Sequence, residues 1–212
     1  MNGSAYVQRC PIYIYLYCLI VVVTTPILLL HDMDIVVWVS RHRLPSLDIF
    51  FLYFTMFGNY VFALGEALYI ALFHRRKEKF RANIAILISY VSWLVSGRVV
   101  VCLKNIFMRP RPYVYNPDVG LIYEKPQDCS FPSGHSSTAL SLTYPLIIEW
   151  RSRGARILLI AYAALMCFSR VYCGVHYPTD VLWGSLIGLL VSHMIYVFIW
   201  TRIGEKQGLR GV

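Results

Sequence analysis

Residues 12–30, IYIYLYCLIVVVTTPILLL, form an uncharged apolar run near the start of the chain. A helix needs roughly 20 apolar residues to cross the ~30 Å hydrocarbon core of a bilayer, so this run predicts a transmembrane helix. A short polar stretch with Arg9 precedes it, as in a signal peptide. The run is longer than the apolar part of a typical signal peptide and lacks a convincing small-residue cleavage site, so we expect a retained span.

Similar runs recur along the whole chain of 212 residues. Hydrophobic residues make up 58% and charged residues 15%, whereas soluble domains are about half apolar and about a quarter charged. This composition excludes an ordinary soluble globule. We predict an all-α, polytopic membrane helical bundle, and no repeat or linker divides residues 1–212 into more than one domain. About six transmembrane helices are expected, at 12–30, 47–73, 82–107, 133–150, 157–173 and 179–200.

The segment His31–Arg43 separates the first two predicted spans. It is short and mixes the charged residues Asp32 and Asp34 with aliphatic residues and Trp38. An amphipathic segment of this kind favours the membrane surface over the hydrocarbon core. We therefore expect a short interfacial helix here.

The basic residues predict the topology. The chain has 20 Lys and Arg residues and a net charge of +9. Twelve of the 20 lie before the first span, in residues 74–81, in residues 151–156, or after the last span. Cytoplasmic segments of membrane proteins carry such an excess, so these segments and both termini are expected to be cytoplasmic. The charge therefore calls for no nucleic-acid partner.

Three other basic residues, Lys104, Arg111 and Arg170, fall near the outer ends of predicted spans. Ser133 and Gly134 begin another span on the same membrane face. Helix ends at one depth meet in a bundle, so we expect a single pocket that is open to the outer water. Three positive charges, a hydroxyl and the N–H groups of a helix N-terminus together form a phosphate cradle.

Two histidines, His135 and His176, lie in the same outer segments. A neutral imidazole can attack phosphorus, while a protonated one donates to the leaving oxygen. Asp180 follows His176 by four residues, which is one helical turn, so its carboxylate can fix the imidazole tautomer. A zinc site formed by both histidines and a carboxylate is disfavoured, because the three neighbouring cations would repel the metal. We expect no metal and no other cofactor.

Three motifs together resemble the signature of the type 2 phosphatidic acid phosphatase superfamily. They are KX6RP from Lys104, PSGH from Pro132 and SRX5HX3D from Ser169. All eleven defined positions match in order, which is far more specific than one short motif. The resemblance covers residues 104–180 directly. It implies that His176 is the nucleophile and forms a phosphohistidine, that Asp180 orients it, that His135 is the acid, and that phosphate is bound by Lys104, Arg111, Ser133, Gly134 and Arg170.

The resemblance implies a metal-independent phosphatase that hydrolyses the phosphomonoester or diphosphate of a lipid. The small size looks bacterial by family analogy, with the site on the periplasmic face of the inner membrane. The lipids that remain open are phosphatidylglycerophosphate, phosphatidate, undecaprenyl pyrophosphate and lipid A 1-phosphate. A lipid phosphotransferase and a non-enzymatic lipid-binding protein are alternatives. Vanadium haloperoxidases share the signature but resemble soluble proteins, so the apolar spans argue against them.

Two further arginines have no assigned role in the signature. Arg109 stands two residues before Arg111, and only Arg111 fits the spacing, so Arg109 is open between a substrate contact and a headgroup anchor. Arg98 lies within the predicted span 82–107. Asn59 is at a similar predicted depth and is its expected partner, although a contact with substrate phosphate stays open.

Two of the six cysteines, Cys129 and Cys173, fall on the predicted outer side. An oxidising compartment permits disulfides, and sequence does not give the distance between the two residues. A disulfide between them is therefore left open.

Overall fold

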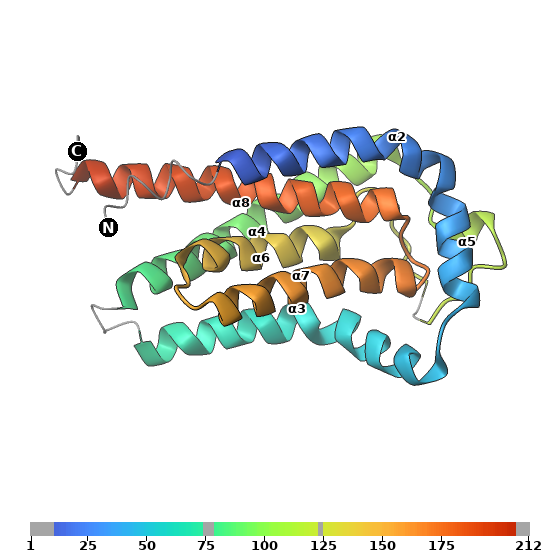
Figure 1. The fold of residues 1–212 in the computed structure, drawn as a ribbon, viewed down its shortest axis with the longest axis horizontal. Coiled ribbons are helices and arrows are strands. Elements are labelled where there is room, and N and C mark those ends of the chain that lie inside the picture. Colours follow the sequence, from blue (N-terminus) through green and yellow to red (C-terminus); the bar gives the residue numbers. More distant parts are fainter. Residues whose placement is uncertain (1–10, 74–78, 123–124, 207–212) are drawn as a thin grey trace.

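The computed structural model describes residues 11–73, 79–122 and 125–206. Throughout this part of the chain the regular structure is helical, which confirms the all-α fold. The long helices run along a common direction as a bundle (Figure 1). The helices are α2 (Pro11–Arg41), α3 (Pro45–Phe73), α4 (Phe80–Phe107), α5 (Pro112–Tyr115), α6 (Gly134–Glu149), α7 (Arg153–Tyr172) and α8 (Pro178–Lys206).

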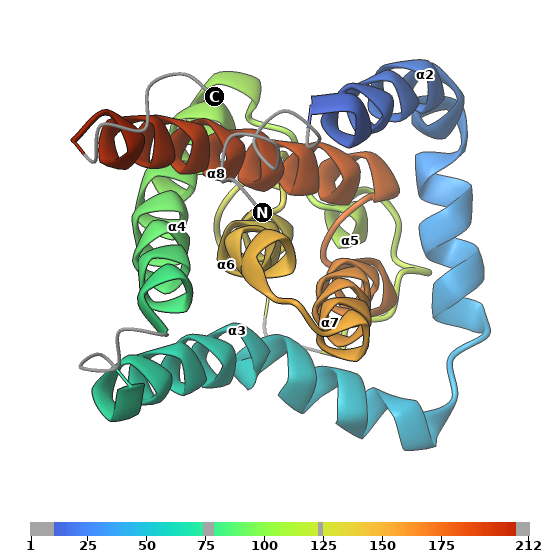
Figure 2. The ribbon, with the colours of Figure 1, turned by 60° about the vertical axis from the view of Figure 1, so that its left-hand side comes forward.

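Helix α6 lies at the centre, with α3, α4, α7 and α8 around it (Figure 2). Many of its buried residues are small or carry hydroxyl groups. The Ser141 hydroxyl lies 2.8 Å from the Ser96 hydroxyl on α4, and Ser89 of α4 donates to the Leu142 carbonyl at 2.9 Å. Small residues and hydrogen bonds of this kind hold membrane helices together, because lipid tails compete with purely apolar contacts.

Helix α8 packs closely on α6 through two glycines spaced four residues apart. A Cβ atom at Gly184 would lie 2.4 Å from the Ser133 carbonyl oxygen, and one at Gly188 would lie 2.2 Å from that of Ser137. Only glycine allows the two backbones to approach this closely. The contact brings the first turns of the two helices together, where the Ser133 N–H donates to the Asp180 carbonyl at 2.9 Å.

Among the described residues, five helices are long and apolar enough to cross a membrane, namely α2, α3, α4, α7 and α8. Helix α6 has 16 residues. At about 1.5 Å per residue it spans about 24 Å, less than the ~30 Å hydrocarbon core. The expected span at 133–150 is therefore a short helix. None of its residues is exposed, because neighbouring helices enclose it (Figure 2). It contacts protein on its sides, so neither its length nor its polarity has to match the lipid.

Helix α2 is continuous from Pro11 to Arg41, so the segment expected to form an interfacial helix is the last part of the first predicted span's helix and not a separate helix. Figures 1 and 2 show α2 changing direction, with its last part running across one end of the bundle. This change of direction agrees with the expected interfacial segment. Asp32, however, is buried instead of facing the membrane surface.

The opposite end of the bundle holds the start of α2, the end of α3, the start of α4, the α6–α7 connection and the end of α8 (Figure 1). The described residues of the basic segments belong to this end. Of these segments, residues 74–78, Arg9 and Arg210 lie outside the described residues.

Candidate active site

The residues of the three motifs gather at the end of the bundle that α2 crosses (Figure 1). The helix termini of α4, α6, α7 and α8 meet there, as the sequence predicts. Lys104 lies in the last turn of α4, His135 in the first turn of α6, Arg170 in the last turn of α7 and Asp180 in the first turn of α8. His176 lies in the α7–α8 connection. Most of this polar set is buried: Lys104, Arg111, Ser133, Arg170, His176 and Asp180.

The two ring nitrogens of His176 face different partners. Nδ1 lies 3.4 Å from Asp180 Oδ2, and Nε2 lies 3.3 Å from Arg111 Nη1. A guanidinium has only donors, so Nε2 must accept and the ring proton of the neutral imidazole must be on Nδ1. This tautomer leaves a lone pair on Nε2. His176 is therefore arranged as a nucleophile, with Asp180 beside its proton-bearing nitrogen.

The Asp180 carboxylate is buried and has donors on both oxygens. Oδ2 accepts from the Tyr177 N–H at 2.9 Å and from the Ser130 hydroxyl. Oδ1 accepts from Arg109 Nη1 at 2.8 Å. A buried carboxylate needs such donors to stay ionised and oriented. Ser130 lies outside the three motifs, two residues before PSGH, and was not predicted as a site residue, whereas Arg109 was predicted to be either a substrate contact or a headgroup anchor.

Lys104 and Arg111 converge on one carboxylate, that of Asp128. Lys104 Nζ lies 2.8 Å from Asp128 Oδ2, and Arg111 Nη2 lies 2.6 Å from Oδ1. Partial burial alone would raise the pKa of Asp128, but the hydrogen bonds and charges of the two cations lower it to about 2. The two cations can thus bind the oxygens of a single anion. Asp128 was not predicted as a site residue, because it lies outside the motifs.

Arg170 and His135 complete the site on the side of α3. Arg170 Nη1 donates to the buried Thr55 hydroxyl of α3. His135 interacts electrostatically with Arg170, His176, Arg111 and Lys104, which places it at the same site. The six-residue set of two histidines, three cations and Asp180 is therefore brought together as the sequence predicts.

The first turn of α6 supplies the remaining donors. Ser133 caps the helix, and its hydroxyl oxygen accepts from the Ser136 N–H at 3.4 Å and the Ser136 hydroxyl at 2.9 Å. The proton of the Ser133 hydroxyl is then left to donate elsewhere. The first N–H groups of a helix, here from Gly134 onward, have no partner within the helix and attract anions.

Asn59 is not the partner of Arg98, so that prediction is wrong. The Asn59 amide nitrogen donates to the His135 carbonyl at 3.4 Å, and its oxygen accepts from the Tyr162 hydroxyl at 2.9 Å. Arg98 lies on an exposed part of α4 instead. A similar predicted depth does not fix the face of the helix on which Arg98 lies.

Cys129 and Cys173 are free thiols, so they form no disulfide in this structure. Cys173 is buried and packs with Phe51, Tyr172 and Val175. It is part of the apolar core beside the site.

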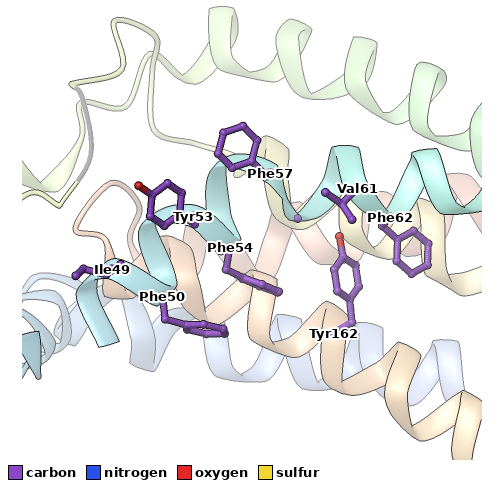
Figure 3. A pocket seen from close by; sticks show the side chains of 9 residues that line it. Ile49, Phe50, Tyr53, Phe54, Phe57, Val61, Phe62 and Tyr162 are labelled. Carbon is purple, nitrogen blue, oxygen red and sulfur yellow. The ribbon is translucent and has the colours of Figure 1, made fainter. Parts of the chain in front are cut away.

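An apolar groove of about 600 Å³ runs between α3 and α7. Figure 3 shows aromatic rings of α3 along it and the Tyr162 ring rising from α7 toward α3. The same helix, α3, carries Thr55, which contacts Arg170. The phosphate-binding end and the apolar groove therefore share one helix. The lining residues are Ile49, Phe50, Tyr53, Phe54, Phe57, Gly58, Val61, Phe62 and Tyr162.

Comparison with known proteins gives one family. The model of the PAP2 superfamily matches residues 82–204. An undecaprenyl-diphosphatase of Sulfolobus acidocaldarius is 31% identical over 163 residues, which are 74% of this chain and 72% of that protein. The crystal structure of Aquifex aeolicus LpxE superposes with a TM-score of 0.66 at 28% identity, over 77% of this chain and 93% of that one. A PAP2-type phosphatidylglycerolphosphate phosphatase from Bacillus subtilis has the same fold, with a TM-score of 0.65 at 24% identity over 90% and 96% of the two chains.

Proposed function

Because the chain belongs to the PAP2 superfamily of membrane lipid phosphatases, we propose that it hydrolyses a lipid phosphate through a phosphohistidine on His176. One observation carries this proposal. Nε2 of His176 faces the cation Arg111 at 3.3 Å, while Nδ1 faces Asp180 at 3.4 Å. A bound phosphate would take the place of the Asp128 carboxylate between Lys104 and Arg111, with phosphorus next to Nε2.

The first step forms a bond between Nε2 of His176 and phosphorus and breaks the bond from phosphorus to the lipid oxygen. His135 gives its proton to that leaving oxygen, so the products are a phosphohistidine and the dephosphorylated lipid. The negative charge of the bound phosphate favours the protonated form of His135. Asp180 accepts the Nδ1 proton in a hydrogen bond and stabilises the positive charge that develops on the ring.

In the second step, His135 takes a proton from water, and the water oxygen attacks phosphorus. The N–P bond breaks, inorganic phosphate leaves, and His135 is again protonated. Lys104, Arg111 and Arg170 stabilise the charge on the phosphoryl oxygens in both steps, together with the N-terminus of α6. These fixed charges do what a metal ion does in other phosphatases, so we propose a metal-independent reaction.

The substrate is a lipid whose tail stays in the bilayer while its phosphate reaches the site. The groove between α3 and α7 supports this, because it is apolar and accommodates a hydrocarbon chain (Figure 3). We propose a bacterial inner-membrane protein with the site on the periplasmic side. The site is separated from the described basic residues of 79–81 and 151–156, which lie at the other end of the bundle (Figure 1), and this separation supports that orientation.

Phosphate release from a panel of lipids tests the function. We expect the purified protein in EDTA to release phosphate from at least one of undecaprenyl pyrophosphate, phosphatidate, phosphatidylglycerophosphate and lipid A 1-phosphate. Vanadate, which imitates phosphate, should inhibit the release. A strict requirement for added Mg²⁺ would contradict the metal-independent mechanism, and transfer of phosphate to a second lipid instead of water would indicate a phosphotransferase.

The pH dependence of activity tests the state of His176. Burial, and then the charges of Arg111, Arg170 and Lys104, lower the pKa of His176 well below 6.5. The nucleophile is therefore neutral above that lowered pKa, so the acid limb of kcat/KM should appear only as the pH drops through it, while loss of the proton from His135 produces the alkaline limb. Replacing Arg111 by Gln removes one of these charges, so the pKa rises and the acid limb should move to higher pH.

The pH profiles of wild type and Arg111→Gln are measured with the same substrate, so that ionisation of the substrate affects both profiles equally. The exposed Arg41, which pairs with Asp118 at 2.6 Å, supplies the control Arg41→Gln with an unshifted acid limb. An acid limb that stays in place in Arg111→Gln would contradict the assignment.

A further inference from the structure

Asp32 is a buried carboxylate on α2, outside the three motifs and outside the residues 82–204 that match the family. Its side chain is 4% exposed, whereas that of Asp34, two residues later on the same helix, is 81% exposed. Burying a carboxylate is costly unless it is paired and hydrogen-bonded. Its position therefore calls for a role that the reaction described above does not include.

The partners of Asp32 come from the site. Asp32 Oδ2 lies 2.8 Å from Arg109 Nη2 and also accepts from the Thr179 hydroxyl. Oδ1 accepts from the Thr179 N–H at 3.1 Å. Thr179 immediately precedes Asp180 in the first turn of α8. One carboxylate thus holds both the arginine and the helix turn that flank Asp180.

Arg109 lies between two buried carboxylates. Its Nη1 lies 2.8 Å from Asp180 Oδ1, on the side of that carboxylate away from His176, and its Nη2 contacts Asp32. The guanidinium carbon also lies 3.8 Å from the centre of the Tyr177 ring. A long arginine side chain has many conformations, and the planar fork is most effective when both of its ends are bound. Asp32 selects the conformation in which Arg109 reaches Asp180.

We propose that Asp32 is a positioning residue for the phosphatase reaction, acting through Arg109 to hold the Asp180 carboxylate in line with Nδ1 of His176. The inference rests on the proposed function. Asp32 touches neither phosphate nor His176, so it contributes only while the Asp180–His176 pair carries the reaction. Phosphate binding uses Lys104, Arg111 and Arg170, and the loss of Asp32 leaves these three in place.

The expected effect is therefore on kcat. In Asp32→Asn we expect kcat to fall about tenfold to 100-fold, the usual range for residues that orient a functional side chain, with KM within about twofold of wild type. Asn keeps the size of the side chain and an oxygen acceptor for the Thr179 N–H. The matched control is Asp34→Asn, which removes the same charge from an exposed position of α2 and should keep wild-type kcat and KM. All variants are measured as full-length protein with the panel lipid that wild type hydrolyses fastest.

A double-mutant cycle separates positioning from a general structural role. Arg109→Gln should show a similar loss of kcat, and adding Asp32→Asn to it should cause little further loss, because Asp32 acts through Arg109. Additive losses, wild-type kcat in Asp32→Asn, or a change confined to KM would overturn the inference. If thermal unfolding shows that Asp32→Asn does not fold, Arg109→Gln provides the test, and a wild-type kcat in Arg109→Gln would overturn the inference.

A wild-type protein that releases no phosphate would contradict the proposed function as well. An active wild type with an unaffected Asp32→Asn would overturn this inference alone.

Discussion

Replacing His176 by Asn should nearly abolish turnover, with kcat lower by at least about 10³-fold. The replacement removes Nε2, which accepts from Arg111 at 3.3 Å and is the atom that we propose forms the bond to phosphorus. Without it, water would have to attack the lipid phosphate directly. The cations and the first turn of α6 still bind phosphate, so KM should change much less than kcat.

The measurement is phosphate release under steady-state conditions, combined with rapid mixing and trapping of the phosphoenzyme at alkaline pH, where phosphohistidine survives. Wild type should show a phosphorylated protein that His176→Asn lacks. His193→Asn is the matched control, because His193 is half-buried in α8, contacts Tyr144 at 2.8 Å and belongs to no motif. A phosphoenzyme of equal amount in His176→Asn would show that another residue is the nucleophile.

The second large effect is expected at Arg111. In Arg111→Gln, kcat/KM should fall about 10²-fold to 10³-fold, the loss typical of removing one preorganised donor from a developing anion. The Arg111 side chain is buried, reaches His176 and shares the Asp128 carboxylate with Lys104. It is therefore the cation best placed to bind both the ground state and the transition state of the phosphoryl group.

Inhibition by vanadate reports phosphate binding separately from chemistry. The vanadate inhibition constant should rise in Arg111→Gln and stay unchanged in Arg41→Gln, where the arginine is exposed at the same end of the bundle. Arg111→Lys should recover only part of the activity, because an ammonium cannot provide the planar fork of a guanidinium. Normal vanadate inhibition in Arg111→Gln would mean that Arg111 does not bind the phosphoryl group.

Several features of the site could be predicted because their signals are local. The four-residue spacing of His176 and Asp180 predicts that the two side chains meet, and they do so at 3.4 Å, although His176 lies in the α7–α8 connection just before the first turn of α8. The glycines Gly184 and Gly188 also carry a local signal, since small residues at this spacing indicate close helix packing. The close packing of α8 on the start of α6 was not predicted, although this glycine pair explains it.

Other features depended on packing that no local pattern records. Asp128 was missed because its role comes from two cations that approach it from α4 and from the loop after α4. The partner of Arg98 was predicted wrongly, because depth in the membrane does not determine rotation about the helix axis. The sequence also did not show that the expected span at 133–150 is enclosed, because its enclosure comes from the neighbouring helices around it (Figure 2).

The sequence by itself determined the all-α membrane fold and the family, and it predicted the candidate site residues, because apolar run length and motif spacing act over a few helical turns. Only the tertiary structure decided that Arg109 pairs with both Asp32 and Asp180. Arg109 is 77 positions from Asp32 and 71 from Asp180 along the chain. Whether such distant charges are exposed or paired depends on how α2 crosses the end of the bundle. Burial then enforces the pairing, because an unpaired charge is costly away from water.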